Sequence, residues 1–188
     1  MPQNLFGLPV HILVVHAVVV LLPVAVVAAI LVAVWRRARE RFGMTVVGLT
    51  FVATVLVPVA SQSGESLQSR LPDSAIVRAH AALGKDLIPF AAVFGICVFA
   101  VVALDIYRRA LGDPGAIHGV AARVWAKLPS GWRSRRERPW LSPGTTVASV
   151  LTVVFAVAVG YLVVRAGHSG AAAVWSHSVH LDRSAATP

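Results

Sequence analysis

The 188-residue chain has a single cysteine, Cys97, and only eight acidic residues. One cysteine cannot form a disulfide within the chain or build a thiolate metal cage, so a metal site would have to use histidine, carboxylate or backbone ligands. The sequence also lacks a glycine-rich phosphate loop and the GxSxG, HExxH and CxxC motifs. We therefore expect that this chain is not an enzyme by itself.

What the chain does have is long apolar segments, because 57% of its residues are hydrophobic, more than a soluble core requires. A helix needs about 20 apolar residues to cross a bilayer. Lipid offers the backbone no hydrogen-bond partners, so each apolar segment is expected to be helical. The sequence predicts a single all-α membrane domain over residues 1–188, a four-helix bundle with spans at about 11–35, 44–61, 81–107 and 145–166.

The basic residues predict the orientation of the spans. Of the 17 Lys and Arg residues, 12 fall in Arg36–Arg41 and Arg108–Arg138, which flank apolar spans. This clustering favours a topological role over nucleic-acid binding, and no nucleic acid is expected as a partner. Cytoplasmic connections hold the excess of Lys and Arg, so both termini and the segment 62–80 are predicted to lie outside. The composition indicates a multi-pass protein of a bacterial plasma membrane.

The inner loop, 108–144, contains a further pattern. Apolar residues recur there at helical spacing, which predicts an amphipathic helix over 116–128 at the cytoplasmic lipid surface. These residues are Ile117, Val120, Ala121, Val124, Trp125 and Leu128. The alternative is a solvated basic loop. Either form would attract anionic lipid.

Six of the seven histidines fall in the predicted outer half of the molecule. His11 and His16 lie about 140° apart on a helix, so they cannot chelate one ion together. We expect His16 to face the bundle interior, with His80 of the diagonal third helix as its companion. Such a pair would hold haem b or a transition metal. Glu65 would tune a ligand, or join the metal set, while His11 and His168 are secondary candidates.

Two other interpretations remain open. In the first, the polar groups only pack against one another, and the chain is a non-catalytic accessory or scaffold subunit of a larger membrane complex. In the second, Glu65, Asp86 and His80 form a proton or ion path, because ionisable groups at membrane depth default to function. At the inner end, Asp105 is expected to form an ion pair beside Arg108 and Arg109.

These residues resemble a known family. Its pattern is matched by Gly7-Leu8-Pro9-Val10-His11, His16, Ser63-Gly64-Glu65, His80, Gly167-His168-Ser169-Gly170-Ala171 and Val174-Trp175. They are similar to the bacterial four-helix membrane family named domain of unknown function 2231. His16, Glu65 and His80 match the family pattern best. His11 matches it less well, because Ile12 follows it where relatives often have proline. His168 also matches it less well, because the residue at its position varies among relatives.

The resemblance implies the kind of membrane complex in which the protein works, but no specific reaction. Relatives are found joined to Rieske iron–sulfur or c-type cytochrome domains. This implies a respiratory or other redox membrane complex as partner, with electron transfer toward the outer face. It also favours haem over a plain metal, because imidazole pairs in helical bundles commonly hold haem.

Overall fold

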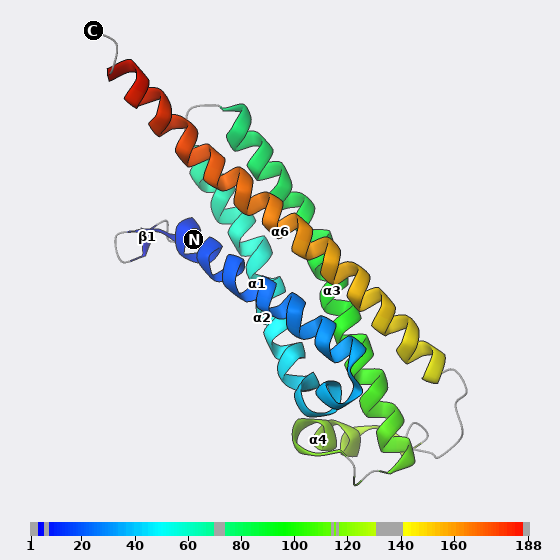
Figure 1. Ribbon diagram of the computed structural model, residues 1–188. Helices are drawn as coiled ribbons and strands as arrows, with labels where there is room; N and C mark the ends of the chain where they lie inside the picture. The colour runs from blue at the N-terminus through cyan, green and yellow to red at the C-terminus, as the bar shows by residue number, and fades with distance from the viewer. Residues whose placement is uncertain are drawn as a thin grey trace.

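The computed structural model describes residues 4–5, 8–69, 74–113, 115, 117–130 and 141–185, with side chains between residues 11 and 172. Four long helices make up most of these residues (Figure 1). They are α1 at Val10–Val34, α2 at Arg36–Gln68, α3 at Ala75–Gly112 and α6 at Leu141–Ala185. The short helix α4 at Gly119–Lys127 follows α3. Two short antiparallel strands, β1 at Asn4–Leu5 and β2 at Leu8–Pro9, precede α1.

All four long helices are long and apolar enough to cross a membrane. The qualifying segments are His11–Val34, Arg36–Gln68, Ala75–Gly112 and Leu141–Ala172. A helix satisfies its own backbone hydrogen bonds, as hydrocarbon surroundings require. The chain is therefore an integral, multi-pass membrane protein built as an all-α four-helix bundle, which confirms the fold class that the sequence predicted.

The helices extend beyond the apolar segments that predicted them. α2 begins at Arg36 and ends at Gln68, whereas its apolar segment covers about 44–61. The basic segment Arg36–Arg41 is thus the start of α2, and Trp35 alone separates α1 from α2. The reason is physical: hydropathy marks only the length that hydrocarbon requires, while arginine is a good helix former and lets the helix continue into the headgroup region.

The long helices form an up-and-down bundle in which each packs against two neighbours (Figure 1). α1 and α3 both pack between α2 and α6, so α1 and α3 are diagonal to each other. Many residues of the core are small, which allows close helix approach where lipid provides no hydrophobic drive for association. The innermost residues are Leu22, Ala25, Ala29, Ala53, Ala91, Phe94, Val98, Ala156 and Val159.

The two ends of the bundle differ in chemistry. We call the end where α1 and α3 begin the histidine end, because His11, Ser63, His80 and Ser169 gather there. The opposite end, with the α1–α2 corner, Arg39 and Asp105, is the arginine end. α4 lies across the arginine end (Figure 1). The positive-inside rule predicts that the arginine end faces the cytoplasm.

α4 docks against the end of α3. Its Trp125 ring packs on Tyr107 with the ring centroids 5.8 Å apart, and Ile117, just before α4, is buried. The helix occupies Gly119–Lys127, within the segment 116–128 for which the sequence predicted an amphipathic helix. The basic stretch from Trp132 to Arg138 lies outside the described residues.

The helix pairs α1–α2 and α3–α6 repeat one pattern of buried positions. On α1 and α3 the shift is 69 residues, from 18 to 87: Val18, Leu22, Ala25, Ala29, Val32 and Ala33 correspond to Leu87, Ala91, Phe94, Val98, Val101 and Val102. On α2 and α6 the shift is 106 residues, from 39 to 145: Arg39, Val46, Thr50, Ala53 and Val57 correspond to Thr145, Thr152, Ala156, Val159 and Val163. Since corresponding helices are diagonal, the halves are related by an approximate two-fold axis along the bundle.

Candidate functional site

His11 opens the apolar part of α1 and points toward the end of α2. Its Nδ1 lies 3.1 Å from the Ala60 carbonyl oxygen and 3.2 Å from Ser63 Oγ. A carbonyl oxygen only accepts, so Nδ1 carries the proton and donates it. In the neutral ring, Nε2 then keeps its lone pair.

His80 makes the matching arrangement between α3 and α6. Its Nδ1 lies 3.0 Å from Ser169 Oγ. The Ser169 hydroxyl donates its own proton to the Ala166 carbonyl oxygen at 2.9 Å, so it accepts from the imidazole. His80 therefore also donates through Nδ1 and keeps a lone pair on Nε2 when neutral.

The two arrangements are counterparts under the two-fold repeat. The segments Ala60–Gly64 and Ala166–Gly170 both read Ala-x-x-Ser-Gly, and the serine in each donates to the alanine carbonyl at 2.9 Å. Each ring also lies over the glycine: a methyl group on Gly64 would come within 2.9 Å of His11 Cε1, and one on Gly170 within 3.2 Å of His80 Cε1. The shifts of 69 and 106 residues relate these groups as they relate the core.

We call His11 and His80 the histidine pair. They lie at the same end of the bundle, on the diagonal helices α1 and α3, in equivalent settings. Ligating histidines in proteins are commonly held this way, with one nitrogen donating to a fixed oxygen and the other left for the metal. The arrangement can thus ligate a metal centre or accept a proton at Nε2.

His16 occupies a different position from the one expected. It is exposed, and its Nδ1 donates to the Ile12 carbonyl oxygen of its own helix at 2.7 Å. The prediction that His16 faces the bundle interior was wrong, because it lies about 140° around the helix from His11, and His11 is the ring that turns toward α2. Among the described side chains, His16 and His80 share no hydrogen bond.

The other predicted site residues lie at the surface of the bundle. Glu65 pairs with Lys85 at 2.9 Å between α2 and α3, with the two side chains 52% and 60% exposed respectively. Within the described part of the chain, Glu65 makes no hydrogen bond to a histidine ring. His168 and Asp86 are exposed on α6 and α3. Among the described residues, His11 is therefore the one whose ring is held in the same way as the ring of His80.

At the arginine end, Asp105 on α3 is the centre of a charged cluster and is fully buried. Its carboxylate lies 2.9 Å from Arg109 Nε and 3.4 Å from Arg108 Nη2, as the sequence led us to expect. The unexpected partner is Arg39 of α2, whose Nε is 3.4 Å from the same carboxylate. Sequence spacing held one clue, because Arg39 shares a helix face with the buried Gly43 and Val46.

Arg39 connects several helices at this end. Its side chain is 9% exposed, and Nη1 donates to the Ala33 carbonyl oxygen and to Ser149 Oγ, both at 3.1 Å. It thereby contacts α1 and α6 as well as α3. A guanidinium at this depth is costly unless paired, so the cluster both requires and positions Asp105.

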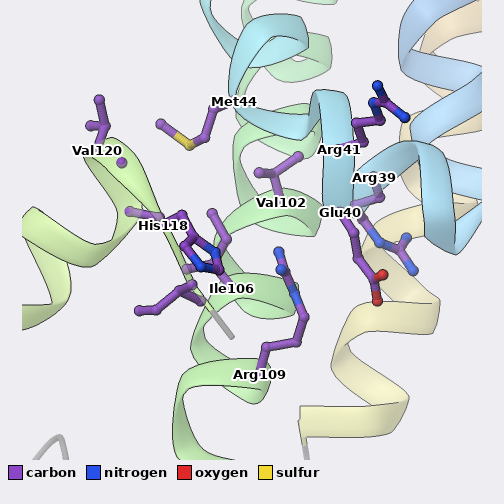
Figure 2. A pocket seen from close by; sticks show the side chains of 12 residues that line it. Arg39, Glu40, Arg41, Met44, Val102, Ile106, Arg109, His118 and Val120 are labelled. Carbon is purple, nitrogen blue, oxygen red and sulfur yellow. The ribbon is translucent and has the colours of Figure 1, made fainter. Parts of the chain in front are cut away.

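A pocket of about 370 Å³ lies beside this cluster, between α2, α3 and α4 (Figure 2). Its basic wall consists of Arg39, Arg41, Arg109 and His118. Sequence reasoning predicted the basic loop but not this pocket, because Arg39 and His118 are brought together only by the docking of α4.

Over the described residues, no group of three or more His, Cys, Asp or Glu side chains could hold a metal ion. The single cysteine, Cys97, is a buried free thiol in the core of α3. A metal site in the described part of the chain would therefore have fewer than three His, Cys, Asp or Glu side chains as ligands.

Comparison with known proteins identifies the family. No curated protein and no solved structure matches the chain. A family model described as "Predicted membrane protein (DUF2231)" matches residues 7–183, which include α1, α2, α3, nearly all of α6 and both members of the histidine pair. The chain therefore belongs to the DUF2231 family of predicted membrane proteins, as its sequence resemblance implied.

Proposed function

We propose that this membrane protein binds haem b through the histidine pair and passes electrons near the histidine end of the bundle. His11 and His80 would hold the haem iron in this proposal, each through Nε2. Ser63 and Ser169 orient the rings by accepting from Nδ1. His11 takes the place of His16 in the sequence-based hypothesis, while His80 keeps its role.

The observation that carries the proposal is the shared tautomer. Both imidazoles donate through Nδ1 to an oxygen of the neighbouring helix, so both neutral rings carry a lone pair on Nε2. A ligand on the two-fold axis would meet both rings in equivalent settings. Four-helix bundles build cofactor sites in this way, from side chains on facing helices.

Haem is favoured over a bare metal ion because of the number of ligands. A metal held by protein alone usually needs three or four side chains, and the described residues offer no group of three. In haem the porphyrin nitrogens already bind the iron, so the protein supplies only the remaining one or two ligands. The two imidazoles of His11 and His80 would therefore be sufficient protein ligands for haem.

The surroundings would be those of membrane electron transfer. The arginine end is predicted to face the cytoplasm, which puts the histidine pair in the outer leaflet of a bacterial plasma membrane. The family resemblance implies a respiratory or other redox complex as the electron partner.

The test is the absorption spectrum and metal content of the protein purified from membranes in mild detergent. We expect a Soret band with about one iron per chain, lost in His11→Ala and in His80→Ala. His16→Ala is the matched control, because that ring is exposed on the same helix as His11, and it should keep the band. A protein with neither a Soret band nor stoichiometric metal would rule out the proposal.

A further inference from the structure

The apolar face of α4 is only partly covered by the bundle. Ile117, just before the helix, is buried, and the Trp125 ring packs on Tyr107 with the ring centroids 5.8 Å apart. Val120 and Val124 belong to the same apolar face, yet they remain 50% and 56% exposed. Because they are four residues apart, the two valines are neighbours on the helix surface. Docking on α3 therefore leaves one flank of the apolar face uncovered.

The exposed valines adjoin a lipid-facing surface of α2. Met44, Phe51 and Val55 share one face of α2, and all three are exposed. In a helix that crosses a membrane, an exposed apolar face of this kind lies against lipid. Met44, the last of these residues toward the arginine end, lines the same pocket as Val120 (Figure 2). The apolar surface thus continues from α2 to α4.

The orientation and the charges of α4 suit the edge of a bilayer. α4 lies across the arginine end and not along the bundle (Figure 1), so it follows the plane of the membrane that the long helices cross. Arg123 and Lys127 are exposed on α4, and long basic side chains can reach the headgroups while their helix lies deeper. Tyr107 and Trp125 are of the aromatic types that are enriched at membrane–water interfaces.

From this continuity we infer that α4 is an interfacial helix, and that Val120 and Val124 enter the hydrocarbon edge of the leaflet at the arginine end. The occupant of the exposed flank is the lipid of the bilayer that surrounds the bundle. Single exposed valines are ordinary on a surface in water, but these two adjoin a face that lipid already covers. α4 would thereby fix the depth of the arginine end in the membrane. The inference is independent of the histidine pair.

The first test measures the depth of α4 with nitroxide labels on the full-length protein, in lipid nanodiscs of dioleoyl phosphatidylcholine and dioleoyl phosphatidylglycerol that hold no other membrane protein. The labels are attached in Val120→Cys, Val124→Cys and Ala126→Cys, each combined with Cys97→Ala to remove the buried native thiol. Ala126 is the matched control, because it is also exposed but lies about 160° around α4 from Val124. A melting temperature equal to that of Cys97→Ala alone reports intact folding.

The readout is the collision rate of each label with oxygen, which concentrates in hydrocarbon, divided by its collision rate with a water-soluble nickel complex. We expect this ratio to be at least about fivefold higher for the labels at Val120 and Val124 than for the label at Ala126. Similar ratios at all three positions would place the valines in water and overturn the inference. Low collision rates with both reagents at the two valines would mean that protein covers them, which would overturn it as well.

The second test puts the same side chain on the two flanks of α4. In the nanodiscs, Val124→Asn should raise the rate of trypsin cleavage after Lys127 by roughly tenfold, because an amide in lipid favours local opening of the helix. Ala126→Asn should raise this rate by less than about threefold, although it loses more helix propensity than Val124→Asn does. A larger effect of Val124→Asn can therefore not come from helix propensity. Equal cleavage rates in the two variants would contradict lipid contact at Val124.

Discussion

The histidine end and the arginine end are formed by the same two helix pairs, yet the repeat survives in the chemistry of only one. At the histidine end, His11 and His80 are counterparts, as are Ser63 and Ser169. At the arginine end, the counterpart of Asp105 is Arg36, an exposed residue at the α1–α2 corner. The symmetric histidine end suits a ligand that lies on the two-fold axis and is bound by both halves. The asymmetric arginine end suits a cluster that occurs once in the molecule.

The arginine end should give the largest effect on stability. Asp105→Asn leaves three guanidinium groups around a neutral amide, and breaking a buried ion pair from one side typically costs about 3–5 kcal/mol. We expect a strong drop in melting temperature and in the folded fraction on size-exclusion chromatography. Asp86→Asn, on the exposed surface of the same helix, is the control. Equal behaviour of the two variants would contradict a structural role for the charged cluster.

The histidine end is tested by its glycines. Gly64→Ala and Gly170→Ala add methyl groups 2.9 Å and 3.2 Å from the His11 and His80 rings, and crowding of this kind costs about 1–3 kcal/mol. The effect should be larger at Gly64. Both variants should also displace the rings and weaken cofactor binding.

The control for the glycines is Gly167→Ala on α6, where nothing lies within 4 Å of the added methyl. Alanine is the better helix former by about 1 kcal/mol, so this variant should be neutral or slightly stabilised in thermal unfolding. If Gly64→Ala behaved in the same way, the close approach of ring and helix would be refuted.

A smaller loss of stability is expected for Gly43→Ala, at the contact between α2 and α3. Gly43→Ala puts a methyl 3.1 Å from Val102 Cγ1, at the contact of α2 with α3. The valine can give way only slightly, and we expect a destabilisation of about 1 kcal/mol. Adding Val102→Ala should restore part of the loss. If the double variant lost more unfolding free energy than the two single variants lose together, direct contact between the two positions would be contradicted.

The smallest effect should come from the exposed pair at the histidine end. Glu65 and Lys85 are each more than half exposed, and such pairs contribute below about 1 kcal/mol. Glu65→Gln should leave the melting temperature and the cofactor content nearly unchanged. A complete loss of cofactor in this variant would restore Glu65 to the ligand environment and break the two-fold description of this end.

Much of the fold could be predicted because hydropathy and helix length are properties of single segments. Which of His11 and His16 faces the neighbouring helix could not be predicted. Both lie in the same outer turns of α1, and only the neighbour at Ala60 and Ser63 decides which ring turns inward. Arg39 was missed as a partner of Asp105 for the same reason, since the pair joins two helices.

The internal repeat was hidden by exchanges of residue size. Leu22 corresponds to Ala91, and Ala25 corresponds to Phe94, so a large side chain in one half stands where the other half has a small one. These exchanges keep the bundle filled but lower the sequence identity between the halves. Burial, which depends on the folded bundle, makes the correspondence visible.

The central claim is that two equivalent imidazoles share one cofactor, and the electron paramagnetic resonance spectrum of the oxidised protein tests it most directly. The account predicts a low-spin ferric haem signal with two imidazole ligands in the native protein, and the loss of this signal in both His11→Ala and His80→Ala. A low-spin signal that persists unchanged in either variant, or a native protein without a haem signal, would contradict it.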